Sequence, residues 1–167
     1  MKKFLQFSGF IAAGLAIAAF IFLMAGSALV YRSGDSASYV PGVRVIFGGE
    51  VKTILGTVKY DLAATALIAW ILILLAMLVL ICLAVLPLLK VKALNKFAGL
   101  LTLCGACALL VGGILLFFSK AAYSAANSDV FDNWSLSFPH VFAAILAIAG
   151  GVIAALPACL NLLGKNK

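Results

Sequence analysis

Four long apolar stretches dominate the pattern of the 167-residue sequence, and every charged residue lies outside them. They run over residues 5–31, 62–89, 97–118 and 141–163. A helix needs about 20 residues, at about 1.5 Å per residue, to cross a hydrocarbon layer of about 30 Å. The pattern therefore predicts an all-α membrane protein, a bundle of four transmembrane helices forming one domain over residues 1–167. Two longer loops, at 32–61 and 119–140, connect the helices within the first and second pairs.

The composition supports a membrane setting. Hydrophobic residues make up 66% of the chain and charged residues 10%, with a mean hydropathy of +1.25. In a soluble domain roughly a quarter of the residues are charged, and these help to cover its surface in water. The net charge of +7 is mostly lysine at membrane boundaries, which indicates contact with anionic lipid rather than with nucleic acid.

The first stretch has two interpretations. Lys2 and Lys3 precede it, and small residues follow at 25–28, as in a cleavable secretory signal. The apolar region of a signal is usually about 7–15 residues long, and this stretch is much longer. We therefore expect it to be the first transmembrane helix.

Charge indicates the orientation. Three segments hold seven lysines and no acidic residue: Lys2, Lys3, Lys90, Lys92, Lys96, Lys165 and Lys167. All five acidic residues lie in the two longer loops: Asp35, Glu50, Asp61, Asp129 and Asp132. Short lysine-rich segments stay in the cytoplasm. The pattern predicts that both termini are cytoplasmic and that the two longer loops lie outside. We expect the membrane to be a plasma membrane, of a bacterium rather than of a eukaryote.

Small residues at four-residue spacing predict where the helices pack, because close approach drives helix association in lipid. The fourth stretch carries Ala143, Ala147, Gly151, Ala155 and Cys159. The third carries Cys104, Ala108 and Gly112, and the first Ser8, Ala12 and Ala16. The second stretch is rich in large side chains, and we expect it to face lipid or a partner.

The first outer loop is predicted to contain a β-hairpin. Residues 43–47 and 51–55 are β-branched or aromatic runs on either side of a link with two glycines, a pattern typical of a hairpin. Apolar side chains left uncovered there would form a contact surface for a partner; the alternative is that they cap the bundle. The candidate contact residues are Val45, Phe47, Ile54, Leu55 and, in the second loop, Trp134.

We predict no catalytic, cofactor or metal site. The apolar stretches contain no ionisable Asp, Glu, Lys, Arg or His, whereas proton or ion relays are built from such groups. Asp129, Asp132 and His140 share the second loop, but their spacing matches no known metal site.

The four cysteines suggest a redox alternative. Cys104 and Cys107 form a CxxC pair, and Cys82 and Cys159 lie in other apolar stretches. A thiol buried in hydrocarbon stays protonated and unreactive. The simpler interpretation is that the cysteines are small residues at helix contacts.

The plan of four helices, a larger first outer loop with β-structure and a smaller second loop resembles that of claudin-like tetraspan proteins. The GLW triplet, the two loop cysteines and the CCG triplet of such families are absent, so the resemblance implies no residue roles. We expect a non-enzymatic subunit, accessory to or assembling a membrane complex, whose partner is another membrane protein or a second copy. The alternatives are a small channel formed by oligomerisation and a membrane thiol–quinone oxidoreductase.

Overall fold

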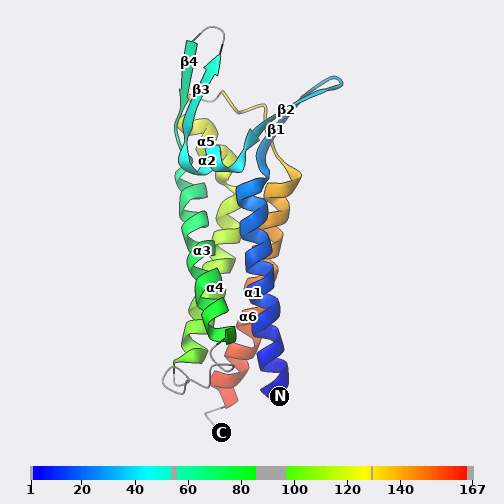
Figure 1. The fold of residues 1–167 in the computed structure, drawn as a ribbon, viewed down its shortest axis with the longest axis vertical. Helices are drawn as coiled ribbons and strands as arrows, with labels where there is room; N and C mark the ends of the chain where they lie inside the picture. The colour runs from blue at the N-terminus through cyan, green and yellow to red at the C-terminus, as the bar shows by residue number, and fades with distance from the viewer. Residues whose placement is uncertain (1, 54–55, 86–96, 129, 165–167) are drawn as a thin grey trace.

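Four long helices run side by side in the computed structural model, which describes residues 2–53, 56–85, 97–128 and 130–164 (Figure 1). They are α1 (Lys2–Ala25), α3 (Ala64–Val85), α4 (Ala98–Phe117) and α6 (Phe138–Gly164). Each contains a segment long and apolar enough to cross a membrane. The predicted four helices of spanning length are therefore present, and small antiparallel sheets accompany them.

The helices form a four-sided bundle in which α1 and α4 each contact both α3 and α6. The most extensive contact joins α4 to α6, and glycines make it close. A Cβ added at Gly113 would lie 2.7 Å from Ile148 Cγ1, and one at Gly151 would lie 2.8 Å from Leu110 Cγ. Neither contact leaves room for a methyl group, so the two backbones approach as small residues permit.

The small-residue series of the fourth helix is Ala143, Ala147, Gly151, Ala155 and Cys159. The first three are buried, the fourth is half-buried and the fifth is exposed. Positions four apart rotate by about 40° per step around a helix with about 3.6 residues per turn, so a long series drifts off the packed face. The same drift takes α4 from buried Gly112 through half-buried Ala108 to exposed Cys104.

The predicted first span is too long at its end. Helix α1 stops at Ala25, and residues Ser27–Ser33 form strand β1. At Gly26 a Cβ would lie 2.5 Å from both Phe22 O and Pro139 Cβ, so the chain turns tightly against the start of α6. Beyond that turn, the sequence Leu-Val-Tyr suits a strand. Apolar character alone did not distinguish the last turns of a helix from a strand.

Strand β1 is the centre of a small sheet with strand order β2–β1–β5. Strand β2 (Ser36–Pro41) pairs with it antiparallel, and β5 (Ser135–Leu136) pairs on its other side. Gly34 and Asp35 link β1 to β2, and Gly34 has a φ of 58°. A glycine with positive φ at the first position of a two-residue link is the requirement of a type II′ hairpin.

The predicted strand over residues 43–47 is wrong. Gly42–Phe47 is a short helix, α2, which follows Pro41 and ends at Gly48, whose φ is 72°. A proline before the first turn and a glycine with positive φ after the last one favour a helix that ends there over a continuous strand. Burial of Val45 and Ile46 outweighs the low helix propensity of β-branched residues.

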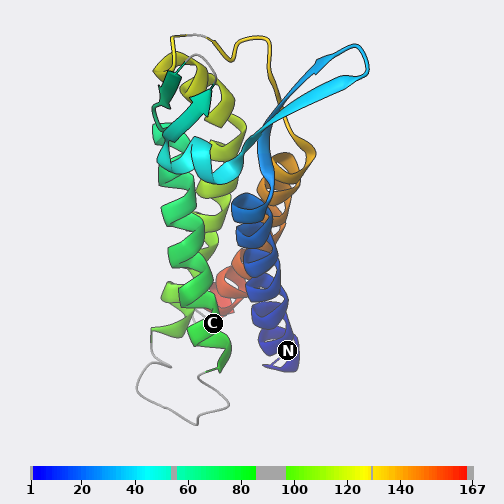
Figure 2. The same ribbon diagram turned by 45° about the horizontal axis from the view of Figure 1, so that its top comes forward.

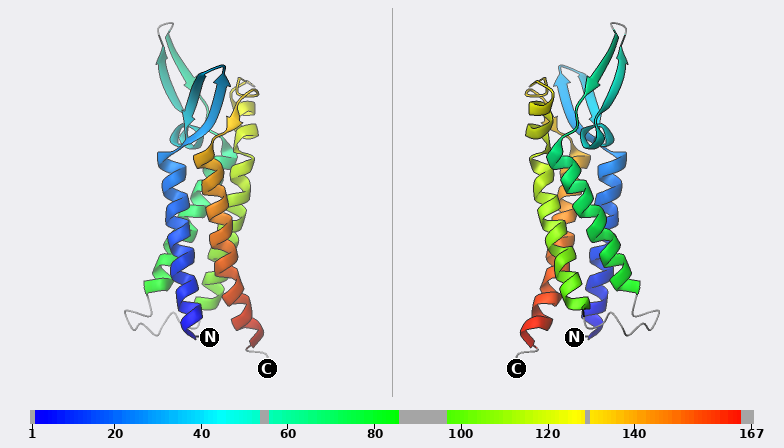
Figure 3. Two further views of the ribbon diagram at one scale, coloured as in Figure 1. Left: turned by 90° about the vertical axis from the view of Figure 1, so that its right-hand side faces the viewer. Right: turned by 90° about the vertical axis from the view of Figure 1, so that its left-hand side faces the viewer.

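The hairpin predicted from strands at 43–47 and 51–55 is displaced along the chain in the structure. It pairs β3 (Gly49–Thr53) with β4 (Gly56–Tyr60). Helix α5 (Ser119–Ala126) occupies the second loop. We call the described residues of 26–63 and 118–137 the cap. Its two hairpins, α2 and α5 lie at one end of the bundle, opposite the start of α1 and the end of α6 (Figures 2 and 3).

Candidate functional site at the cap of the bundle

Aromatic rings hold the two halves of the cap together. Phe131, from the second loop, contacts the rings of Tyr123, Tyr60 and Trp134 at centroid distances of 4.7, 5.6 and 5.3 Å. Trp134 also contacts Tyr31 of β1 at 5.6 Å. Offset and edge-on pairs at such distances contribute about 0.5–1.5 kcal/mol each beyond area burial. The cluster fixes the second loop beside both hairpins.

Hydrogen bonds fix the same junction from its polar side. The backbone N–H of Asp61 donates to Asn127 Oδ1 at 2.8 Å, and Asn127 Nδ2 donates back to the Asp61 carbonyl at 3.1 Å. Within the second loop, Ser124 Oγ donates to Asp132 Oδ1 at 2.6 Å, and Lys120 Nζ donates to the Asp132 carbonyl at 2.9 Å. The cap therefore has a defined shape.

Tyr123 lies in the interior of the cap, with 0% exposure. Its hydroxyl has no hydrogen-bond partner among the described residues. Burial raises the pKa of Tyr123 to about 12, against the opposing attraction of the nearby Arg44. The phenol therefore stays neutral at physiological pH, where it acts as an apolar ring with an unsatisfied donor.

Ser119 and His140 form a buried polar pair where α5 and α6 begin. Their side chains are 0% and 1% exposed, and Ser119 Oγ lies 2.8 Å from His140 Nε2. The hydroxyl also donates to the Leu116 carbonyl at 2.6 Å, so its oxygen is left to accept a hydrogen from Nε2. Because its proton is donated to the backbone and its side chain is fully buried, this serine joins the end of α4 to the starts of α5 and α6 rather than presenting a nucleophile.

Among the described residues, no three His, Cys, Asp or Glu side chains lie close enough to hold a metal ion. His140 is engaged with Ser119, and Asp132 accepts from Ser124. Asp129 lies outside the described residues. The structure thus gives no geometry for a metal site in the part of the second loop that it describes.

The outer strand of the three-stranded sheet is a free edge. Strand β2 pairs with β1 on one side only. Five of its six residues are exposed, with Tyr39 at 60%, and none of the six is charged. An uncharged, exposed edge strand is a template for pairing with another chain, and most proteins protect such edges.

The alternating pattern of an antiparallel ladder shows which groups are free. The pair Ser33 and Ser36 flanks the two-residue link and is therefore a hydrogen-bonded pair. Tyr31 and Ser38 are the next such pair along the register. It follows that the backbone N–H and C=O of Ala37 and Tyr39 point away from β1.

The second hairpin, β3–β4, carries charged residues that the β2 edge lacks. Strands β3 and β4 project beyond the bundle (Figure 1), and their extensive contacts are with each other. Glu50 lies opposite Lys59, and Lys52 lies opposite Thr57. Charged residues, lysine in particular, discourage pairing along an edge. Of the two hairpins, only β1–β2 presents an uncharged outer strand.

The sequence-predicted contact residues lie in different surroundings. Val45 is fully buried, so it is not part of an exposed surface. Phe47 is 45% exposed and packs edge-on against Trp70 of α3 at 5.1 Å. Trp134 is half-buried in the aromatic cluster. Ile54 and Leu55 lie outside the described residues. The structure therefore does not gather the three candidates that it describes into one exposed patch.

The expectation that the cysteines occupy helix contacts is wrong. Cys82, Cys104, Cys107 and Cys159 are all exposed on the bundle and form no disulfide. In a spanning helix, such positions face lipid. Cysteine is small enough for a helix contact, but in this bundle glycine and alanine fill those positions.

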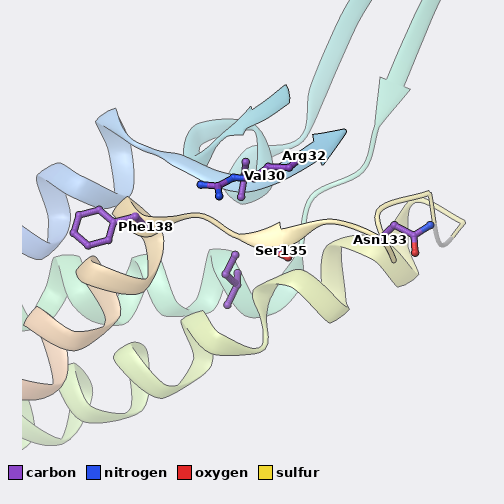
Figure 4. A pocket seen from close by; sticks show the side chains of 6 residues that line it. Val30, Arg32, Asn133, Ser135 and Phe138 are labelled. Atoms are coloured by element: carbon purple, nitrogen blue, oxygen red, sulfur yellow. The ribbon is translucent and has the colours of Figure 1, made fainter. Parts of the chain in front are cut away.

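A shallow groove of about 370 Å³ runs from the start of α6 along β5 (Figure 4). Its lining residues are Val30, Arg32, Asn133, Ser135, Leu136 and Phe138. Strand β1 supplies Val30 and Arg32, β5 supplies Ser135 and Leu136, Asn133 precedes β5, and Phe138 is the first residue of α6. In Figure 4, the Arg32 side chain extends over Val30 towards the end of the groove where Phe138 lies.

Sequence reasoning missed β2 because residues 33–38 are polar and lack a long apolar run. A signal was present: the Gly34-Asp35 pair separates two short segments that contain Val and Tyr, which is typical of a tight hairpin. No comparable signal existed for Ser119 and His140, whose contact depends on how the start of α6 lies against α5.

Fold and cap together define the class: a helical protein with four helices of membrane-spanning length and apolarity, capped at one end by two small antiparallel sheets. No protein-family model matches the chain, and no curated protein matches its sequence.

Proposed function

We propose that this chain is a non-enzymatic, multi-pass protein of the plasma membrane that acts through contacts with another membrane protein, as an accessory or assembly subunit. The cap lies outside the cell and the lysine-bearing segments lie in the cytoplasm. The distribution of seven lysines and five acidic residues supports this orientation, through the rule that short basic segments stay inside.

One observation carries the proposal: β2 is an uncharged, exposed edge strand on a cap that is otherwise well fixed. The aromatic cluster and the Asp61–Asn127 hydrogen bonds hold the sheet in place before any partner arrives. When a partner adds an extended segment to β2, the association therefore costs less conformational entropy than if β2 first had to become ordered.

The main-chain groups of Ala37 and Tyr39 give the edge its affinity, and side chains give it selectivity. Tyr39 is the largest exposed side chain on β2. Exposed tyrosine is enriched in protein interfaces because its ring buries a large area at low entropic cost. The partner's extended segment thus pairs with β2 and packs a side chain on the Tyr39 ring.

Site-specific photocrosslinking in native membranes tests the proposal. A photoreactive phenylalanine analogue replaces Tyr39 in one variant and Val58, an exposed position of the charged hairpin, in a matched variant. We expect a discrete protein adduct from position 39 and a much weaker one from position 58. Adducts of lipid alone at position 39, together with a strictly monomeric purified protein, would contradict the proposal.

A further inference from the structure

The groove beside β5 points to a second function of the cap. We propose that it binds the phosphodiester headgroup of an anionic phospholipid, with Arg32 as the cation that holds the phosphate. This inference concerns lipid and does not depend on a protein partner at β2. It rests on the level in the membrane at which the groove lies, on the direction of the Arg32 side chain, and on the neighbouring hydrogen-bond donors that no described residue occupies.

Phe138, the first residue of the apolar segment of α6, indicates the level in the membrane at which the groove lies. Its ring is 74% exposed and stacks on Phe142 at 5.4 Å, and Phe142 meets Phe22 of α1 edge-on at 5.1 Å. A wholly apolar phenylalanine surface at the first residue of an apolar segment belongs in the hydrocarbon layer, at its outer edge. The lower end of the groove therefore lies at the top of the hydrocarbon layer.

The polar part of the groove falls at the level of the headgroups. Ser135 precedes Phe138 by three residues, which span at most about 10 Å in an extended chain. The headgroup region adds roughly 5–8 Å on each side of the hydrocarbon. A lipid phosphate beside Phe138 is thus within reach of the Ser135 side chain, while Asn133 lies at the outer end of the groove, as Figure 4 shows.

Arg32 points to a phosphate as the ligand. Its side chain extends towards the membrane end of the groove (Figure 4). In the described part of the chain, its guanidinium forms no ion pair and no hydrogen bond. Asn133 and Ser135 likewise offer side-chain donors that no described residue occupies. A planar guanidinium beside hydroxyl and amide donors suits the oxygens of a phosphodiester.

The charge balance favours an anionic lipid over a zwitterionic one. Arg32 is the only cation among the groove residues, and none of them is acidic. A choline group next to the phosphate would oppose this positive charge, whereas the glycerol of phosphatidylglycerol would not, and its hydroxyls can accept from Asn133. Within a Debye length of about 8–10 Å, this difference is only partly screened.

Lipid binding to the purified, full-length protein tests the inference. Native mass spectrometry and thermal unfolding in detergent are followed while phosphatidylglycerol or phosphatidylcholine is added. We expect phosphatidylglycerol to remain bound and to raise the melting temperature more than phosphatidylcholine does. Arg32→Gln should weaken phosphatidylglycerol binding about tenfold, as for the loss of a charge-assisted hydrogen bond.

Lys59→Gln is the matched control, because it removes an exposed cation of the cap from the other hairpin. It should change phosphatidylglycerol binding by less than about twofold, as for a charge distant from the ligand. Ser135→Ala, which removes one hydroxyl, tests the groove even if Arg32→Gln folds poorly, and should also weaken binding. Equal binding by the wild type and the variants at Arg32 and Ser135 would overturn the inference.

Inorganic phosphate separates a lipid from a free anion. If millimolar phosphate alone raises the melting temperature through Arg32 and displaces phosphatidylglycerol, the groove is a site for a soluble anion and the lipid assignment is wrong. We expect phosphate to do neither, because it cannot contact Phe138. These outcomes are independent of crosslinking at Tyr39, so either proposal can fail alone.

Discussion

Ser119 Oγ lies 2.8 Å from His140 Nε2 in a buried position where α5 and α6 begin. Because the serine proton is donated to the Leu116 carbonyl, the hydrogen between the two side chains belongs to Nε2. In a neutral ring Nδ1 is then an acceptor, and it has no partner among the described residues. A single hydroxyl thus joins the end of α4, the start of α5 and the start of α6.

The first prediction concerns the energy of this pair. Ser119→Ala leaves the buried Nε2–H unpaired and should lower the free energy of unfolding by about 1–3 kcal/mol. His140→Leu keeps a similar volume and removes the group that needs the serine. In the double variant the effects should be non-additive by about 0.5–3 kcal/mol, as for residues in contact. The measurement is thermal or denaturant unfolding in detergent, and strict additivity would contradict the interaction.

Glycine at the α4–α6 contact gives a second prediction. Gly113→Ala places a methyl group 2.9 Å from the backbone oxygen of Ala144 as well as against Ile148, so the helices must separate. We expect the free energy of unfolding to fall by about 1–3 kcal/mol, as at other overpacked sites. The measurement is a lower melting temperature in detergent.

Gly14→Ala is the matched control within the four long apolar helices. A Cβ at Gly14 meets nothing within 4 Å, and alanine is the better helix former by up to about 1 kcal/mol. This variant should therefore be neutral or slightly stabilised. A melting temperature for Gly113→Ala equal to or above that of Gly14→Ala would show that α4 and α6 are not in close contact.

The helices were predictable from sequence, and their ends were not. Apolar length alone indicates four helices because lipid-spanning segments need about 20 apolar residues. That signal stays apolar past Ala25, where the chain leaves the helix because Gly26 must pass Pro139. The turn depends on a contact between residues more than 100 positions apart, which local pattern does not contain.

The candidate site was predictable only in outline. Short apolar runs between glycines indicate β-structure in the first loop, and β-structure is present. The pattern does not decide between helix and strand for residues 43–47, because runs of this length are ambiguous. Their burial against the bundle decides it. The exposed edge at β2 follows from pairing with β1, so no property of residues 36–41 alone could identify it.

The third prediction uses the raised pKa of Tyr123. An unfolded phenol ionises near pH 10, whereas the folded one keeps its proton to about pH 12. Unfolding therefore releases a proton between these values, and stability should fall as the pH rises through this window. Below about pH 10 both states are protonated, and the residue adds no pH dependence.

Tyr123→Phe should flatten the loss of stability between about pH 10 and pH 12, relative to the wild type. It should not destabilise the protein at pH 7, because it removes an unsatisfied buried hydroxyl whose desolvation cost is about 1–3 kcal/mol. Tyr39→Phe, which alters an exposed ring, should leave the alkaline profile unchanged. The readout is the melting temperature as a function of pH, and equal profiles for the two variants would contradict the assignment.

The fourth prediction distinguishes the two sides of β2. Proline lacks the backbone N–H, so it interrupts a ladder only where that N–H is used. The Ala37 N–H points away from β1, whereas the Ser38 N–H donates to Tyr31 across the hairpin, as the register requires. Ala37→Pro should change the free energy of unfolding by less than about 0.5 kcal/mol. Ser38→Pro should cost about 1–3 kcal/mol.

Hydrogen exchange followed by mass spectrometry over residues 27–41 resolves the same difference locally. Ser38→Pro should speed exchange across β1 and β2, because it opens the centre of the hairpin, and Ala37→Pro should leave β1 protected. In native membranes Ala37→Pro should nevertheless abolish the adduct formed from position 39, since it removes a donor that a partner strand needs. If Ala37→Pro unfolds the hairpin as much as Ser38→Pro does, the backbone groups of Ala37 pair with β1 and do not form the free edge. The groups assigned to a partner would then be those of Ser38.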